Sequence, residues 1–325
     1  MRNVLYYNID GNLSYEKELL EKWGVHDLNL CEIKDPDRER GLAASIRNTK
    51  AEGLVVAYDH VTKEIMESCP TLMLISLQSI GCDAIDIDAA KQYGIAVTNV
   101  PGYCMEEVAT HTIGMILDLA RSITFLDRTV RAGKWDPMLS YPMHRLSGQS
   151  LGLVFFGEIP KRVAPIAKAL GMRVLVYAPT KSADELGRYG CEKAETLDQL
   201  LLESDFVSLH CPLIEGLTYH LLGEREFSLM KKDACLINTA RGSVVDEKAL
   251  YDALVHKKIR AAAVDVIEDE INDKSILFGL DNCIMTPHSA FLSEDSYYEA
   301  KRRCLEHLVE GLSANKPPLL TLQEG

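Results

Sequence analysis

The sequence lacks the features that mark several classes of protein. Lysine and arginine number 35 against 48 aspartate and glutamate residues, and the net charge of −13 excludes a basic surface for nucleic acid. No apolar run approaches the about 18 residues that span a membrane, and no charged segment followed by an apolar core marks a secretory leader. We therefore expect no nucleic-acid partner and no association with a membrane.

Metal and disulfide signatures are also missing. The nine cysteines form no C-x-x-C pair and no tight cluster with histidine, so no metal site is predicted. Their number is odd, and several lie inside apolar runs, as Cys235 does in DACLINT. They are interpreted as reduced core residues of a cytoplasmic protein.

What the sequence does contain is a regular alternation of short apolar runs and amphipathic segments. At 325 residues and 47% hydrophobic composition, about two domains with sizeable cores are expected. The alternation predicts an α/β fold with two doubly wound parallel sheets, the second a Rossmann-type dinucleotide-binding domain. We place the substrate (catalytic) domain at 1–102 plus 292–325 and the dinucleotide-binding domain at 103–291.

Residues 151–179 contain the most informative stretch, LGLVFFGEIPKRVAPIAKALGMRVLVYAP. Apolar strands at 153–156 and 174–177 flank a segment with helical spacing, which predicts the βαβ unit that holds a dinucleotide pyrophosphate. The glycine fingerprint is incomplete, because Phe155 and Pro160 replace the outer glycines and only Gly157 remains. Ala178 stands where an acidic residue that contacts the ribose is usual. By itself this pattern also fits an ordinary helix packed on a sheet.

Polar residues follow the predicted strands of the second domain. Thr239, Ala240, Arg241, Asp265 and His288 all lie at or just beyond strand ends. Ligands of open α/β sheets bind at the carboxyl ends of the strands, so these residues mark the candidate site.

A long apolar helix at 105–122 and an aromatic-containing arm at 124–147 precede the βαβ unit. The arm carries Trp135, Tyr141 and Pro142. Exposed aromatic residues favour a subunit contact, and a packed surface loop is the alternative. We expect a homodimer formed through these two segments.

From about residue 72 to residue 300, the chain resembles the D-isomer-specific 2-hydroxyacid dehydrogenases. The segments that carry the resemblance are SIGCDAIDIDAAKQYGIAVTNVP, VATHT, 151–179, SLHCPL, NTARGSVVDEKAL, AAVDVIEDE and TPHSAF. Within the family they are most similar to the phosphoglycerate dehydrogenase and C-terminal-binding-protein branches. The resemblance implies hydride transfer between a nicotinamide cofactor and a small D-2-hydroxy acid or 2-keto acid.

The resemblance also implies a catalytic trio of Arg241, Glu270 and His288. His288 is the expected general acid and base, because imidazole titrates near neutral pH. Glu270 would orient His288 and favour its protonated form. Arg241 would bind the substrate carboxylate and keto oxygen. Ile271 departs from the family pattern, which has proline after the glutamate.

Further site residues follow from the family motifs. The substrate carboxylate is expected at the backbone turn of Ser79, Ile80 and Gly81. Asp265 would approach the nicotinamide. The expected cofactor contacts are Thr112, Gly157, Glu158, Ile159, Ala178, Cys211, Pro212, Thr239, Ala240, Asp265 and Ala290.

The expected cofactor is NAD, and Ala178 leaves NADP open. Thr180, Lys181 and Ser182 follow Ala178 directly and offer a cation and two hydroxyls to a 2′-phosphate. The altered glycines predict weaker cofactor binding than in a relative with all three. Two alternatives to an active oxidoreductase remain: an NAD(H)-binding regulatory protein of the corepressor type, and a weakened pseudoenzyme.

Overall fold

The computed structural model describes residues 1–9, 11–35, 39–140, 142–270, 272 and 274–313. It divides the chain into two compact units: Met1–Tyr103 with the segment that starts at Ser293, and Cys104–Leu292. Each unit is an α/β layer structure around a parallel sheet, which confirms the predicted fold class. No helix in the described part of the chain is long and apolar enough to cross a membrane.

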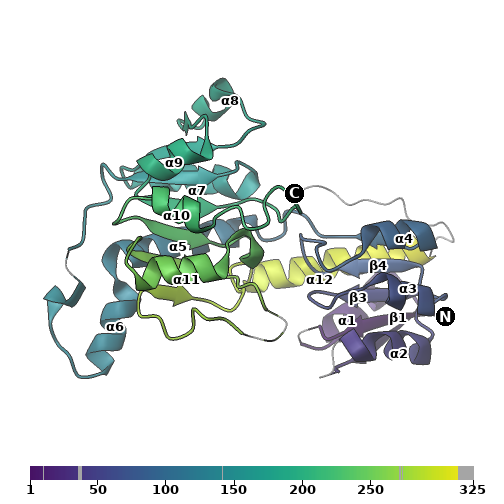
Figure 1. The fold of residues 1–325 in the computed structure, drawn as a ribbon. Helices are drawn as coiled ribbons and strands as arrows, with labels where there is room; N and C mark the ends of the chain where they lie inside the picture. The colour runs from purple at the N-terminus through teal and green to yellow at the C-terminus, as the bar shows by residue number, and fades with distance from the viewer. Residues whose placement is uncertain (10, 36–38, 141, 271, 273, 314–325) are drawn as a thin grey trace. The chain divides into compact units, whose positions relative to one another are not determined.

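The first unit has a five-stranded sheet in the order β2-β1-β3-β4-β5 (Figure 1). Its strands are β1 (Arg2–Tyr7), β2 (Leu28–Ile33), β3 (Gly53–Val56), β4 (Leu74–Leu77) and β5 (Ala96–Thr98). Its helices are α1 (Ser14–Trp23), α2 (Glu39–Thr49), α3 (Lys63–Ser68), α4 (Ile87–Tyr93) and α12 (Glu294–Leu308), followed by the π-helical turn η3 (Val309–Ser313).

Both faces of this sheet are buried. Leu5 and Tyr7 point to the core under α2, α3 and α4, whereas Val4 and Tyr6 point to the core under α1 and α12. Successive side chains of a strand alternate between faces, so a strand covered on both sides must be apolar throughout. The continuous apolar run at residues 4–7 is the sequence signal of that arrangement.

The second unit has a seven-stranded parallel sheet in the order β12-β11-β10-β9-β6-β7-β8. Its strands are β6 (Ser150–Val154), β7 (Arg173–Tyr177), β8 (Glu192–Lys193), β9 (Phe206–Leu209), β10 (Cys235–Asn238), β11 (Ala261–Val264) and β12 (Cys283–Met285). Its helices are α5 (Met105–Arg121), α6 (Ile123–Arg131), α7 (Glu158–Ala169), α8 (Ala183–Gly187), α9 (Leu197–Glu203), α10 (Glu224–Leu229) and α11 (Glu247–Val255), with 3-10 turns η1 (Pro137–Ser140) and η2 (Gly242–Val244).

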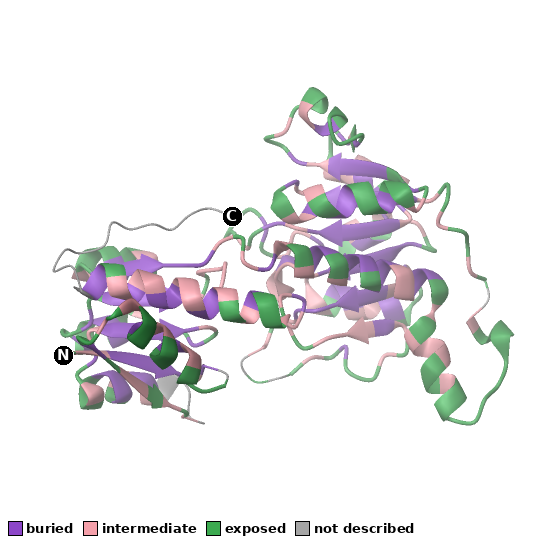
Figure 2. Ribbon diagram, turned by 180° about the vertical axis from the view of Figure 1, so that it is seen from behind, coloured by how far each residue is buried: buried purple, intermediate pink, exposed green. Residues whose placement is uncertain are grey.

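The strands of this sheet are the buried centre of the unit (Figure 2). Buried residues of α5 and α7 pack on one face, and those of α9, α10 and α11 pack on the other. The strand order reverses between β6 and β9, which makes that pair the topological switch point. A ligand of such a sheet is expected outside the carboxyl ends of these strands.

Two local features shape the ends of the long helices. Ser122 adopts a left-handed conformation at φ 52°, which ends α5 and separates it from α6. The closing helix α12 is α-helical to Leu308, and the chain continues as η3. Neither feature moves the strand ends that carry the candidate site.

Candidate active site

The predicted catalytic residues follow three neighbouring strands. Arg241 comes after β10, Glu270 after β11 and His288 after β12, and these strands are adjacent in the sheet. Parallel strands deliver their carboxyl ends to the same edge, which is called the carboxyl edge below.

His288 and Glu270 form a pair at this edge. Nδ1 of His288 lies 2.7 Å from Oε2 of Glu270, and the two side chains are 29% and 34% exposed. The other carboxylate oxygen of Glu270 accepts the amide of Ile267 at 3.3 Å. Since Nδ1 faces the carboxylate, a substrate oxygen would be reached through Nε2. The pairing has the geometry of an oriented acid–base group.

The backbone at His288 is strained, and hydrogen bonds to Asp265 hold the turn that carries it. Its φ is 48°, a conformation that costs a non-glycine residue about 1–3 kcal/mol. The amide of His288 donates to the carbonyl of Asp265 at 2.7 Å. The Asp265 side chain, only 2% exposed, accepts the amides of Ser289 and Ala290 at 2.9 Å and the hydroxyl of Thr286.

Asp265 thus organises the turn that presents His288. The carboxylate of Asp265 already accepts the amides of Ser289 and Ala290, so neither that carboxylate nor the Ala290 amide is without a partner. A contact of Asp265 with the nicotinamide remains a prediction from the family motif.

The loop of Arg241 is braced by Asn238. The buried Asn238 side chain donates to the carbonyl of Arg241 at 2.9 Å and accepts the amide of Ala240 at 3.0 Å. Nη1 of Arg241 donates to the carbonyl of Ala240 at 2.7 Å. At Gly242 a Cβ would overlap the backbone of Ile267, so only glycine lets this loop pack against the segment that carries Glu270.

The predicted position of the cofactor phosphates is the start of α7. Among the described residues the amides of Glu158 and Ile159 have no hydrogen-bond partner, and Gly157 faces open space. Unpaired amides and the helix dipole favour an anion there. This part of the chain therefore fits a dinucleotide pyrophosphate.

Phe155 occupies the first glycine position of the fingerprint at φ 69°. The turn has kept the left-handed backbone that glycine adopts freely, although a phenylalanine stands there. The amide of Phe155 donates to the carbonyl of Tyr177 at 2.8 Å, and its ring packs, partly buried, on the core beside α9–α11. The substitution therefore preserves the shape of the turn at the expense of strain.

The negative charge of Glu158 is offset by two cations of the same helix. Its carboxylate lies 2.6 Å from Nζ of Lys161 and 3.3 Å from Nη1 of Arg162. The hydrogen bond from Lys161, helped by Arg162, lowers the pKa of Glu158. The two cations therefore offset the negative charge that Glu158 places at the phosphate end.

The ribose end is apolar where an acid is usual. Ala178 is 3% exposed at the end of β7. In the loop that follows, Nζ of Lys181 lies 2.7 Å from Glu185, and the hydroxyl of Ser182 caps α8 by accepting the amide of Glu185 at 3.2 Å. The side chains of Lys181 and Ser182 therefore both contact Glu185 of α8.

Two other predicted cofactor residues, Thr112 and Cys211, are buried. Thr112 is fully buried, and its hydroxyl bonds the carbonyl of Val108 at 2.8 Å and the hydroxyl of Thr239 at 3.0 Å. Burial raises the pKa of the Cys211 thiol to about 12, so this side chain is uncharged. Pro212 beside it is exposed. Thr112 therefore contacts the site through Thr239.

The histidine of the SLHCPL motif is not an alternative acid. Desolvation lowers the pKa of His210 to about 3, and its Nε2 lies 3.0 Å from the hydroxyl of Ser208. It is neutral at working pH. Within the described residues, no group of three or more histidine, cysteine or acidic side chains is arranged to hold a metal ion.

In the first unit, the turn at 79–81 follows β4. All three carbonyls of this turn accept hydrogen bonds. The Asn99 side chain donates to the carbonyl of Ile80, the Ser79 hydroxyl donates to that of Gly81 at 2.8 Å, and the Val100 amide donates to that of Ser79 at 3.0 Å. Among the described residues the amides of Ile80 and Gly81 donate to no other group. A rigid turn with two available amides can bind a carboxylate.

Sequence reasoning missed two supporting residues. Nε2 of His111 lies 3.1 Å from the hydroxyl of Thr286, which in turn donates to Asp265. Asn238 braces the Arg241 loop, and an asparagine at a strand end before a turn is a recognisable signal for that role. The contact of His111 links segments 175 residues apart and has no local signal.

Comparisons with known proteins agree with this geometry. Residues 113–290 match the family model described as D-isomer specific 2-hydroxyacid dehydrogenase, NAD binding domain. The chain is 40% identical to glyoxylate reductase of Korarchaeum cryptofilum over 92% of this chain and 90% of that one. It is 39% identical to hydroxypyruvate reductase of Thermotoga maritima, over 77% and 79%.

A solved structure gives the same result in three dimensions. D-lactate dehydrogenase from Aquifex aeolicus, complexed with NAD and lactic acid, superposes with a TM-score of 0.83 at 32% identity, covering 99% of this chain and 100% of that one. The chain belongs to the D-isomer-specific 2-hydroxyacid dehydrogenase family.

Proposed function

We propose that this protein reduces a small 2-keto acid to the D-2-hydroxy acid with a nicotinamide cofactor, using His288 as general acid. Family membership supports the coarser statement, an oxidoreductase that acts on the CH–OH group of a 2-hydroxy acid. The observation that carries the finer proposal is the 2.7 Å contact of His288 with Glu270 at the carboxyl edge.

Each residue of the trio has a distinct task. A nicotinamide cofactor, held at the start of α7, would supply the hydride for the keto carbon. His288 gives its proton to the keto oxygen through Nε2, and in the oxidation direction it takes the proton back. Glu270 fixes the ring through Nδ1 and stabilises the imidazolium. Arg241 binds the substrate carboxylate through its fork of donors.

A keto-acid panel tests this proposal. Glyoxylate, hydroxypyruvate and pyruvate would be assayed with NADH and with NADPH. The wild-type protein should reduce at least one of them, and His288→Ala should lower kcat by about 100-fold or more. His256→Ala, an exposed histidine at the end of α11, is the matched control. Near-normal turnover by His288→Ala would refute the assignment of the general acid.

For the cofactor we propose NAD with weak discrimination against NADP. Ala178 provides neither hydrogen bonds to the ribose hydroxyls nor repulsion of a 2′-phosphate. Lys181 could turn from Glu185 to such a phosphate, since its side chain is 30% exposed. Calorimetry with both cofactors tests this, and a preference for NAD of about a hundredfold or more would contradict it.

A regulatory, nucleotide-sensing role is the second candidate. The observation that favours it is Phe155, whose φ of 69° puts strain into the turn that would bind the pyrophosphate. A turn under strain predicts weaker binding of either cofactor. Measurable but weakened cofactor binding without turnover of any keto acid would support this alternative over catalysis.

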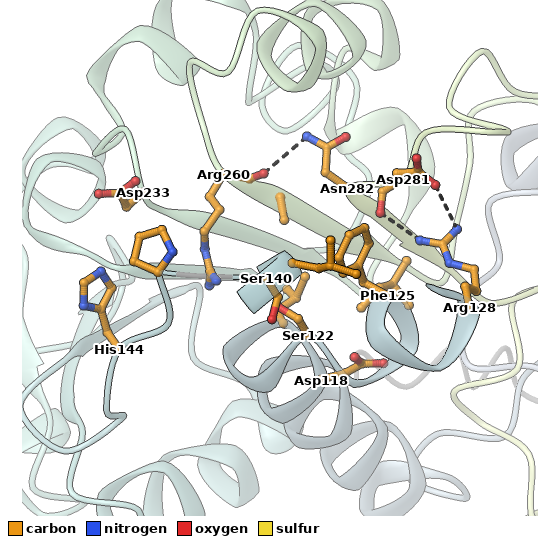
Figure 3. Close-up of a pocket in the computed structure, with 15 residues that line it drawn as sticks. Asp118, Ser122, Phe125, Arg128, Ser140, His144, Asp233, Arg260, Asp281 and Asn282 are labelled. Atoms are coloured by element: carbon orange, nitrogen blue, oxygen red, sulfur yellow. Dashed lines mark hydrogen bonds and ion pairs between the residues drawn. The ribbon is translucent and has the colours of Figure 1, made fainter. Parts of the chain in front are cut away.

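We also propose a homodimer that uses α5, α6 and the arm at 124–147. In α6 no residue is buried, and Trp135 on the arm is 87% exposed. A cavity of about 340 Å³ opens between the end of α5, α6 and the starts of β11 and β12 (Figure 3). Leu119, Phe125 and Ile284 line it together with Arg128.

Such a groove beside exposed apolar residues is suited to a protein contact. Tyr141 of the arm lies outside the described residues. Light scattering at micromolar concentration should give twice the chain mass, and a monomer mass would reject the proposal.

All nine cysteines are free thiols, which supports a cytoplasmic location.

A further inference from the structure

A second histidine, His220, contacts the segment that carries Glu270. Its Nε2 lies 2.6 Å from Oε1 of Glu268, and its backbone is left-handed at φ 49°. The His220 amide donates to the carbonyl of Ser243 at 2.8 Å, and the ring of Tyr219 stacks on the imidazole at 4.1 Å. These contacts hold the imidazole in one orientation, which points to Glu268.

Glu268 is held from a second side by Glu247, the first residue of α11. The amide of Glu247 donates to Oε1 of Glu268 at 3.4 Å, and the amide of Glu268 donates to Oε2 of Glu247 at 3.3 Å. Glu247 also accepts the Ser275 hydroxyl at 2.9 Å and the Ile276 amide at 3.1 Å. It therefore ties residue 268 to residues 275 and 276 within the connection between β11 and β12.

The anchored segment is short and leads directly to the active site. Ile267, next to Glu268, donates its amide to Oε1 of Glu270, whose other oxygen contacts His288. On the far side, Gly242 packs against the backbone of Ile267 without space for a Cβ. A displacement of Glu268 would therefore move the backbone that orients Glu270.

We propose that His220 is a positioning residue for the reaction: by holding Glu268 it keeps the carboxylate of Glu270 on Nδ1 of His288. The His220 and Glu268 side chains are 32% and 34% exposed, so their pairing contributes little to overall stability. Catalysis is more demanding, because a supporting contact that loosens an oriented group lowers its efficiency. The consequence for turnover rests on the proposed function, whereas the consequence for the segment does not.

The test uses His220→Asn in the full-length protein. Asparagine tolerates a left-handed backbone, so the change removes the contact to Glu268 with little added strain. Hydrogen exchange of the amides at 266–270 should accelerate by at least about threefold. The matched control is His256→Asn, which should leave this exchange as in the wild type.

Turnover supplies the second measurement. Without the hold on Glu268, the Glu270 carboxylate should no longer stay on Nδ1 of His288. The pH at which keto-acid reduction falls to half its maximum should then move down by about 0.5 unit or more. In a Glu270→Ala background the same substitution should not move this pH further, because the route through Glu270 is already absent. His220→Gln, which retains an N–H donor of similar reach, should restore most of the wild-type profile.

The outcomes separate the two proposals. Unchanged exchange at 266–270 would overturn the role of His220 whether or not the protein is active. Faster exchange with an unmoved pH profile in an active enzyme would also overturn it, because the contact would then be only structural. A wild-type protein that reduces no keto acid would refute the proposed function, and faster exchange would still support the hold of His220 on the segment.

Discussion

The buried ion pair between Glu16 and Lys301 allows a quantitative prediction about the first unit. Nζ of Lys301 on α12 lies 3.0 Å from Oε1 of Glu16 on α1, and the side chains are 3% and 0% exposed. Nζ also donates to the carbonyl of Asn12 at 3.0 Å and to the hydroxyl of Tyr297 at 3.4 Å. Nζ of Lys301 is not aligned for a hydrogen bond with the Glu16 carboxylate, so the attraction between the two groups is mainly Coulombic.

Replacing Lys301 by methionine keeps the aliphatic volume and removes the charge. Glu16 is then buried opposite an apolar group, and breaking a buried pair in this way costs about 3–5 kcal/mol. Removing both charges is much less costly, because no uncompensated ion is left. We therefore expect Glu16→Leu combined with Lys301→Met to recover at least about 2 kcal/mol of the loss.

Urea unfolding followed by tryptophan fluorescence measures this loss in the first unit. The chain has two tryptophans. Trp23 packs against the core under α1 and α12, whereas Trp135 in the second unit is already 87% exposed. The change in emission on unfolding therefore reports mainly the first unit, which avoids treating a chain of two units as one transition.

A surface pair in the same unit is the matched control. Lys91 and Asp88 are 57% and 97% exposed, so Lys91→Met should change the free energy of unfolding by no more than about 1 kcal/mol. The loss in Lys301→Met should also persist at high salt, because a buried pair is poorly screened. A loss below about 1 kcal/mol, or a double variant no more stable than Lys301→Met, would refute the reasoning.

Three further predictions concern the second unit. Arg241→Ala should cost about 1.5–3 kcal/mol of transition-state binding. Steady-state kinetics should therefore show a kcat/KM about 10- to 150-fold lower. An unchanged KM and kcat would contradict the role of Arg241. Ala178→Asp should increase the preference for NAD over NADP by about tenfold or more in calorimetry, and no change would place the ribose elsewhere. Burial acts to raise the pKa of Asp205, but hydrogen bonds from Lys231 and Ser150 prevail and hold it below its usual value. The stabilisation it provides is therefore present above pH of about 4 and is lost as the pH falls through the lowered value; thermal unfolding of Asp205→Asn between neutral and acid pH should lack that loss.

The sequence alone determined the architecture and, through its family motifs, led to the prediction of the trio. Strands buried on both faces must be continuously apolar and helices must repeat every 3.6 residues, so local order encodes both sheets. The two-residue strand β8 and the short helix α8 were not predicted, because elements of this length have no detectable period. Arg241, Glu270 and His288 were predicted because the segments NTARG, AAVDVIEDE and TPHSAF resemble the family's motifs, whereas the strand ends alone marked only Arg241 and His288.

The tertiary structure decided which of these groups work together. The left-handed backbone at Phe155, the link from His220 to Glu268 and the burial of Lys301 on Glu16 are not visible in the sequence. Glu16 and Lys301 lie on the first helix and the last, and His220 and Glu268 are separated by 48 positions. Periodicity describes neighbours along the chain, whereas these pairs exist only because packing brings distant segments into contact.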